Sequence, residues 1–114
     1  MPSNNKEILS RLSAGVLAMK KLAPKAMEGF LALDKAAVEA GVLDVKTKEL
    51  IALAIGVAAR CDGCIAVHVN HAVKAGATIE EIAETLAVAV SMGGGPSMVF
   101  ATRALEALAE FTAK

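Results

Sequence analysis

Both cysteines and both histidines of the chain lie in one stretch, residues 61–71, as Cys61, Cys64, His68 and His71. Two cysteines at C-x-x-C spacing can close a disulfide ring with little backbone movement, and their thiolate form attacks peroxides and disulfides. If this stretch is helical, the four side chains share one narrow stripe, because residues three and four apart lie on the same face. His68 then follows Cys64 by one turn and can accept its proton as a general base.

One carboxylate, Glu49, opens an otherwise uncharged helical run that extends to Ala59. An unpaired carboxylate would be costly to bury there, and hydrogen bonding to an imidazole would recover that cost while raising the basicity of the ring. Glu49 precedes Cys61 by twelve residues, about 18 Å along one straight helix. The acid can therefore serve the sulfurs only if the next helix folds back antiparallel and brings His68 to Glu49. A bridging water or a Glu49 from a neighbouring subunit would also close the gap.

Each of these residues also has a structural interpretation. The cysteines could be small core residues, His68 a hydrogen-bonded core histidine, and Glu49 a partner of the helix dipole; their combination favours redox chemistry instead. Cys61, Cys64, His68 and His71 also have the ligand types of a Cys₂His₂ zinc site. Four ligands on one helix would approach a tetrahedral ion from one side only, so we expect no metal.

Composition excludes several classes of function. Twelve basic and twelve acidic residues cancel, so no charge pattern for nucleic acid or an anionic membrane is present. The longest uncharged run, 85–102, is broken by glycines 93–95 and Pro96, which argues against a membrane span. The N-terminus lacks the pattern of a signal peptide. We expect a cytoplasmic protein, in which a C-x-x-C is more often catalytic or metal-binding than structural.

Helical periodicity and the capping signals predict an all-α single domain, 1–114, of about six helices. The helices are expected to begin near Asn4 or Asn5, Pro24, Asp44, the cysteine pair, Thr78 and Pro96, with Thr78 and Glu81 forming a capping box.

The apolar side chains are expected to face inward. We expect the second helix to bury Phe30 and Leu33, the third to be buried on nearly every side, and the last to turn Val99 and Leu105 inward. Hydrophobic residues make up 55% of the chain, more than a small domain easily hides, so part of this surface is expected to form a subunit interface.

The spacing of Glu49, Cys61, Cys64 and His68, with eleven, two and three residues between them, resembles the signature of the alkylhydroperoxidase D and carboxymuconolactone decarboxylase family. The flanking segments 46–54, 75–82 and 92–96 agree with it, and the resemblance covers roughly residues 43–108. It implies an all-helical protein that assembles into homotrimers or homohexamers. It also implies a thiol peroxidase or disulfide oxidoreductase that acts on a hydroperoxide or disulfide, with Glu49 and His68 relaying protons to the cysteine pair.

That resemblance implies no separate cofactor, since the redox group is the Cys61–Cys64 disulfide itself, recycled by an unidentified thiol reductant. Decarboxylase members generally lack the cysteine pair, so its presence favours the redox branch. A decarboxylase or lactone-type activity of His68 and Glu49 is one alternative, and a non-catalytic zinc-binding or interaction module is another. We expect Cys64 to be the nucleophile because it lies one turn from His68. The opposite assignment stays open: in thioredoxin-like helices the first cysteine is the exposed one, and that position here is Cys61.

A further feature of the cysteine pair is the residue between them. Asp62 places a negative charge beside the thiols and opposes thiolate formation, unless its side chain caps the helix that follows.

Overall fold

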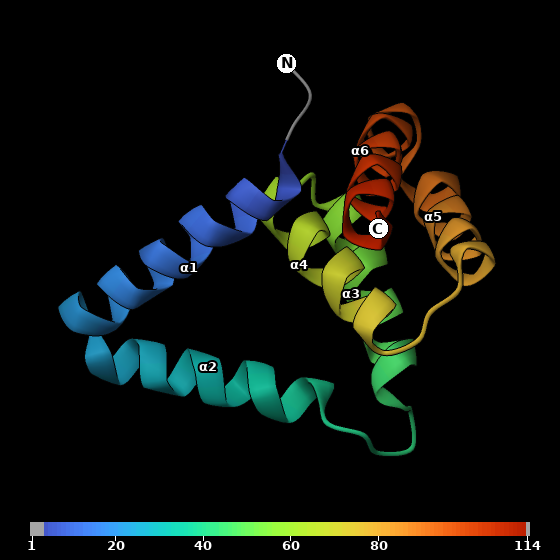
Figure 1. Ribbon diagram of the computed structural model, residues 1–114. Helices are drawn as coiled ribbons and strands as arrows, with labels where there is room; N and C mark the ends of the chain where they lie inside the picture. Colours follow the sequence, from blue (N-terminus) through green and yellow to red (C-terminus); the bar gives the residue numbers. More distant parts are fainter. Residues whose placement is uncertain (1–3, 114) are drawn as a thin grey trace.

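The computed structural model describes residues 4–113, and within this range the chain is entirely helical apart from its turns (Figure 1). The six helices are α1 (Asn5–Leu22), α2 (Pro24–Val38), α3 (Val45–Ala58), α4 (Asp62–Lys74), α5 (Ile79–Gly93) and α6 (Gly95–Thr112). The predicted all-α fold of six helices is confirmed. None of the helices in the described range is both long enough and apolar enough to cross a membrane.

Local capping chemistry explains where most of these helices begin. The side chain of Asn4 accepts a hydrogen bond from the Glu7 amide at α1, and that of Asp44 accepts from Thr47 at α3. The capping box predicted at α5 is present, with Thr78 and Glu81 each accepting from the backbone of the other. These side chains satisfy amides that have no partner inside the helix.

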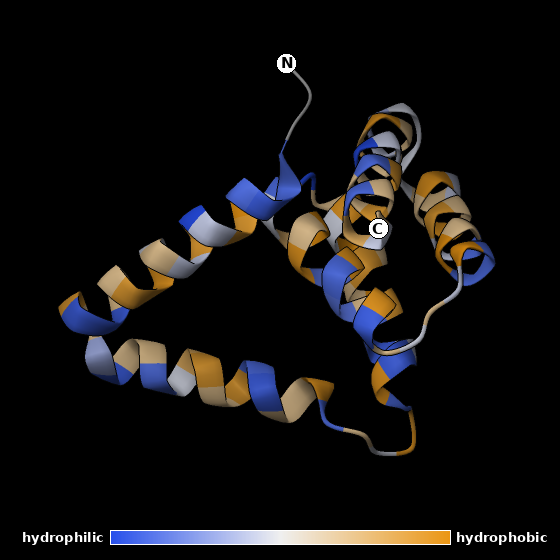
Figure 2. Cartoon of the chain, in the orientation of Figure 1, coloured by the Kyte–Doolittle hydropathy of each residue, from blue (hydrophilic) through white to orange (hydrophobic). Residues whose placement is uncertain are grey.

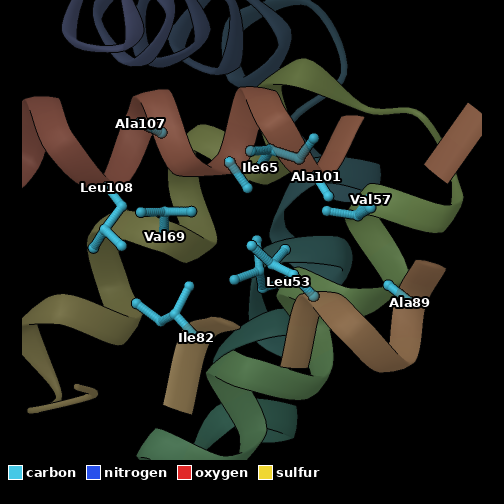
Figure 3. Packing of buried hydrophobic residues seen from close by; sticks show 11 residues of the cluster. Leu53, Val57, Ile65, Val69, Ile82, Ala89, Ala101, Ala107 and Leu108 are labelled. Atoms are coloured by element: carbon cyan, nitrogen blue, oxygen red, sulfur yellow. The ribbon is translucent and has the colours of Figure 1, made fainter. Parts of the chain in front are cut away.

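Within residues 4–113, the cluster of buried hydrophobic residues comes from α3, α4, α5 and α6. Figure 3 shows Leu53 and Val57 of α3 against Ile65 and Val69 of α4, with Ile82 of α5 nearby. The contribution of α6 is mostly alanine: Ala101, Ala104 and Ala107 are buried together with Leu108. Small side chains on α6 allow its backbone to approach α4 closely, which is how an alanine-rich chain builds a packed core.

By contrast, α1 and α2 form an arm that extends from this four-helix core (Figure 1). No residue of α2 is buried, and Phe30 and Leu33 are 59% and 66% exposed. The expectation that this helix buries both side chains is therefore wrong for the isolated chain. Figure 2 shows hydrophobic residues along both helices of the arm.

Two further expectations of burial are also wrong for the isolated chain. In α3, Ile51 and Ile55 are exposed, and in α6 Val99 and Leu105 are exposed. Helical periodicity identifies an apolar face, but none of the six described helices covers these faces in the single chain.

A carboxylate near the end of the chain fastens α1 to the core. Glu110 of α6 accepts hydrogen bonds from the amides of Asn5 and Lys6 at 2.8 and 2.9 Å, and from the Asn5 side-chain amide at 3.1 Å. Burial raises the pKa of the Glu110 carboxyl, but these three donated hydrogen bonds and the charge of Lys6 outweigh it and lower the pKa overall. The negative charge also faces the positive end of the α1 dipole.

Candidate active site

A tight turn between α3 and α4 places the two cysteines. The amide of Arg60 donates to the carbonyl of Val57, and that of Cys61 donates to the carbonyl of Gly56. This pair of bonds is a Schellman motif, which requires a left-handed residue after the helix cap. Arg60 takes that conformation, with φ of 59°, although glycine is the residue that adopts it without strain. The chain thus reverses direction immediately before Cys61.

Cys61 and Cys64 are joined in a disulfide at the start of α4, with their Cα atoms 5.2 Å apart. Cys61 is the N-cap residue of this helix, and its sulfur accepts a hydrogen bond from the Cys64 amide at 3.1 Å. Both residues are half-buried. The amides and the positive end of the helix dipole favour negative charge on Cys61 sulfur whenever the disulfide is reduced.

Glu49 and His68 meet within one chain, as the antiparallel arrangement of α3 and α4 predicts. The Nδ1 atom of His68 lies 2.7 Å from Glu49 Oε1, and Glu49 is only 4% exposed. At the opposite end of the helix pair, a Cβ atom added to Gly56 would lie 3.0 Å from Cys64 Cβ. The two helices therefore run antiparallel in close contact, and neither a bridging water nor a second subunit is needed to join acid and base.

The Glu49 contact determines which nitrogen of His68 can act as a base. An ionised carboxylate only accepts hydrogen bonds, so Nδ1–H of His68 must be the donor. The neutral ring then carries its free lone pair on Nε2. His68 follows Cys64 by one turn of α4, and Nε2 is the ring nitrogen that the Glu49 contact leaves free to take a proton.

His71 contacts the other oxygen of the same carboxylate. Its Nδ1 atom lies 3.4 Å from Glu49 Oε2, and its ring meets that of His68 edge to face with centroids 6.0 Å apart. In the described residues, the side chains close enough together to hold a metal ion are Glu49, His68 and His71, without the cysteines. The four-ligand set of the sequence-based zinc hypothesis is not the cluster that the fold brings together.

Sequence reasoning missed the partner of Asp62. Cys61, not Asp62, caps α4, and both Asp62 carboxylate oxygens accept from Nη1 of Arg103 at 2.8 and 2.9 Å. The Arg103 guanidinium also lies over the Phe100 ring, 4.3 Å from its centroid. No local pattern could reveal this ion pair, because 41 residues separate its members. Arg103 offsets the negative charge that Asp62 places beside the sulfurs.

Two surface hollows border the histidines. One of about 260 Å³ lies between α2 and α3 and is lined by His68 with Ile51 and Ile55. Another of about 430 Å³ lies between the α1–α2 arm and α4 and is lined by His71 with Asn70. A larger hollow than either, of about 480 Å³, lies between α5 and α6 and contains none of the site residues. The volume of a hollow therefore does not identify the reaction centre here, whereas the side chains that line it do.

Comparisons with known proteins agree with this fold and identify its family. The sequence profile of the carboxymuconolactone decarboxylase family matches residues 24–107. A solved protein of this family from Legionella pneumophila superposes with a TM-score of 0.92 at 47% identity, over 95% of this chain and 96% of that one. Another from Thermotoga maritima, for which a part in the antioxidative response has been suggested, superposes with a TM-score of 0.82 at 34% identity, over 90% and 87% of the two chains.

Curated relatives cover nearly the same length. An uncharacterized protein from Cupriavidus necator is 38% identical over 105 residues, which are 92% of this chain and 93% of that protein. An uncharacterized protein from Haemophilus influenzae is 44% identical over 102 residues, 90% of each. The profile and the solved structures agree, and the chain belongs to the carboxymuconolactone decarboxylase family.

Proposed function

We propose that the protein is a thiol-dependent peroxidase or disulfide oxidoreductase with an antioxidant role in the cytoplasm. One observation carries the proposal: the Cys61–Cys64 pair lies at the start of α4, one turn before a histidine that a buried carboxylate holds. The part suggested for the Thermotoga maritima relative in the antioxidative response supports the proposed antioxidant role.

The proposed reaction begins with the reduced pair. His68 Nε2 takes the Cys64 proton, and the Cys64 thiolate attacks the terminal oxygen of a hydroperoxide. The O–O bond breaks, the alcohol leaves with the proton from His68, and Cys64 becomes a sulfenic acid. Cys61 sulfur then attacks Cys64 sulfur, which forms the disulfide and releases water. An external dithiol must supply two electrons and two protons to restore the reduced pair.

The helix start supports this division of roles between the sulfurs. Charge on Cys61 is favoured by the Cys64 amide and the helix dipole, so Cys61 is suited to resolve the sulfenic acid and to leave when a reductant attacks Cys64. Glu49 is a positioning residue, because it touches His68 and keeps the Nε2 lone pair available.

The test uses reduced protein and single cysteine variants. Wild type should consume about one equivalent of hydroperoxide and lose both thiols. Cys61→Ser should stop at a sulfenic acid on Cys64 that a dimedone-type probe traps, whereas Cys64→Ser should trap little. A sulfenic acid only in Cys64→Ser would reverse the roles. A decarboxylase-type reaction would need only His68 and Glu49, so activity on a lactone substrate that survives Cys64→Ser would favour that alternative. Thiols that react only after denaturation would refute the redox proposal.

We further propose that the protein works as a homotrimer or homohexamer. Exposed apolar side chains on the arm, such as Phe30 and Leu33, and on α3, such as Ile51 and Ile55, support a subunit interface. Light scattering at micromolar concentration should give three or six chains per particle. A mass equal to one chain would refute the assembly.

A further inference from the structure

His71 has no part in the proposed reaction, yet it lies against the central carboxylate of the site. It follows His68 by three residues on α4, and its Nδ1 atom faces Glu49 Oε2 at 3.4 Å while His68 Nδ1 faces Oε1 at 2.7 Å. Both oxygens of one carboxylate thus face an imidazole nitrogen. The Glu49 side chain is 5% exposed, whereas those of His68 and His71 are 20% and 49% exposed.

The chemistry of these three side chains suits a divalent cation. In the described part of the chain, the ion pairs found for Glu49 are those with the two histidines. With neutral rings the group carries one negative charge and offers two imidazole nitrogens and a carboxylate oxygen. Nitrogen and oxygen ligands of this kind favour zinc and its neighbours in the first transition row over calcium or magnesium.

The geometry is close to that of a bound ion. One ligand atom from each residue lies within 4.8 Å of the others. Bonds of about 2.0–2.1 Å to a tetrahedral ion place its ligand atoms about 3.3 Å apart, which the Glu49–His71 separation of 3.4 Å already matches. The closer His68 contact must open slightly, and no pair of ligand atoms must close by more than about 1.5 Å, which side-chain rotation can supply. Ligands three residues apart on one helix are a known arrangement for carboxylate–histidine metal sites.

We propose that Glu49, His68 and His71 bind one divalent ion of the zinc type, with solvent completing its coordination. Three protein ligands on one side leave an open position, as in zinc sites that keep a water. The ion would bind His68 Nδ1 and the Glu49 carboxylate. It would therefore replace the hydrogen bond between them that orients His68 in the proposed peroxidase reaction. Bound metal should therefore inhibit that reaction, a consequence that rests on the proposed function, whereas the binding itself does not.

The disulfide form of the protein isolates this site, because oxidised sulfurs cannot act as thiolate ligands. Zinc chloride would be titrated into fully oxidised protein by calorimetry, and cobalt chloride would replace it for spectroscopy. We expect one ion per chain, visible d–d bands of bound cobalt, and no sulfur-to-cobalt charge-transfer band. X-ray absorption of the zinc form should show nitrogen and oxygen neighbours at about 2.0–2.1 Å and no sulfur at about 2.3 Å.

Variants then identify the ligands. Loss of a residue that merely supports a metal ligand costs about 10–100-fold in affinity, so His71→Ala and His68→Ala should each cost at least this much. Asn70→Ala, a polar neighbour on the same helix, should bind as wild type does. Circular dichroism would check that each variant remains helical, and Cys61→Ser/Cys64→Ser should retain wild-type affinity.

Three results would overturn the proposal: no binding by the oxidised wild type, sulfur in the coordination shell, or equal affinity of wild type and His71→Ala. The last would mean an adventitious ion only, held by surface carboxylates. None of these readings uses peroxide or reduced thiols. Failure of the metal site therefore leaves the proposed peroxidase reaction untouched, and failure of that reaction leaves the metal site untouched.

Discussion

Replacement of Glu49 by glutamine tests whether the proposed proton relay depends on the negative charge of this side chain or only on its size and hydrogen bonding. Glutamine keeps the size of the side chain and an oxygen that can accept from His68 Nδ1–H across the present 2.7 Å. Only the negative charge is removed, and the buried amide can still turn its NH₂ group toward His71. We expect the variant to fold and to react more slowly than wild type near neutral pH.

The expected size of the effect follows from the hydrogen bond that changes. A bond to a charged group contributes about 1.5–3 kcal/mol, and a neutral bond about 0.5–1.5 kcal/mol. The imidazolium formed during proton transfer from Cys64 therefore loses about 1–1.5 kcal/mol of stabilisation, close to a tenfold decrease in rate. His68→Ala removes the base itself and should cost about 10²–10⁴-fold.

The double variant provides the sharpest comparison. Glu49 acts on the sulfur only through His68, so Glu49→Gln should change the rate by less than about twofold once His68 is alanine. We would follow alkylation of the reduced protein and reduction of tert-butyl hydroperoxide across pH 5–9 for the wild type and all three variants. Glu84→Gln, the same substitution at an exposed position of α5, serves as the control.

Two outcomes would refute this reasoning. If Glu49→Gln reacts at the wild-type rate across the pH range, the carboxylate is structural and orients no base. If the two single losses multiply in the double variant, Glu49 acts on the reaction without His68, and the contact between them is not a relay.

Three other predictions concern the frame of the site. Arg60→Gly should raise the free energy of unfolding by about 1 kcal/mol, because glycine adopts φ of 59° without strain; a loss in denaturant melts would contradict the strain at this turn. Glu110→Gln should cost about 1 kcal/mol near pH 7, as loss of a helix cap does. Since the folded pKa of Glu110 is below its ordinary value of 4.5, this stabilisation is complete above pH 4.5 and is lost as the pH falls through the folded pKa. The gap in melting temperature between wild type and variant should therefore close in acid, and a gap that widens there would contradict it. Arg103→Gln should slow thiol alkylation up to about fivefold by leaving Asp62 unpaired near the sulfurs, and adding Asp62→Asn should restore the rate; a loss that persists in the double variant would point to packing on Phe100 instead.

Local sequence determined the helices and allowed the pairing of the cysteines, because both depend on near neighbours along the chain. Asp44 and the Thr78–Glu81 box are recognisable caps, and each begins a helix as expected. The C-x-x-C spacing likewise allowed the Cys61–Cys64 disulfide at the start of α4.

Only the tertiary structure decided the contacts between helices. The approach of His68 to Glu49 was expected on the condition that α3 and α4 run antiparallel, and the turn at Arg60 supplies that condition. The second contact of Glu49, with His71, and the pairing of Asp62 with Arg103 had no local signal.

The same distinction explains the errors of burial. Helical periodicity correctly marked apolar faces, but Phe30, Ile55 and Leu105 are exposed in the single chain. A periodic pattern indicates that one face of a helix is apolar. Which surface covers that face depends on the helices that lie beside it, and these belong to this chain or to another copy. That proximity is a property of the whole fold and of its assembly, and no short stretch of sequence contains it.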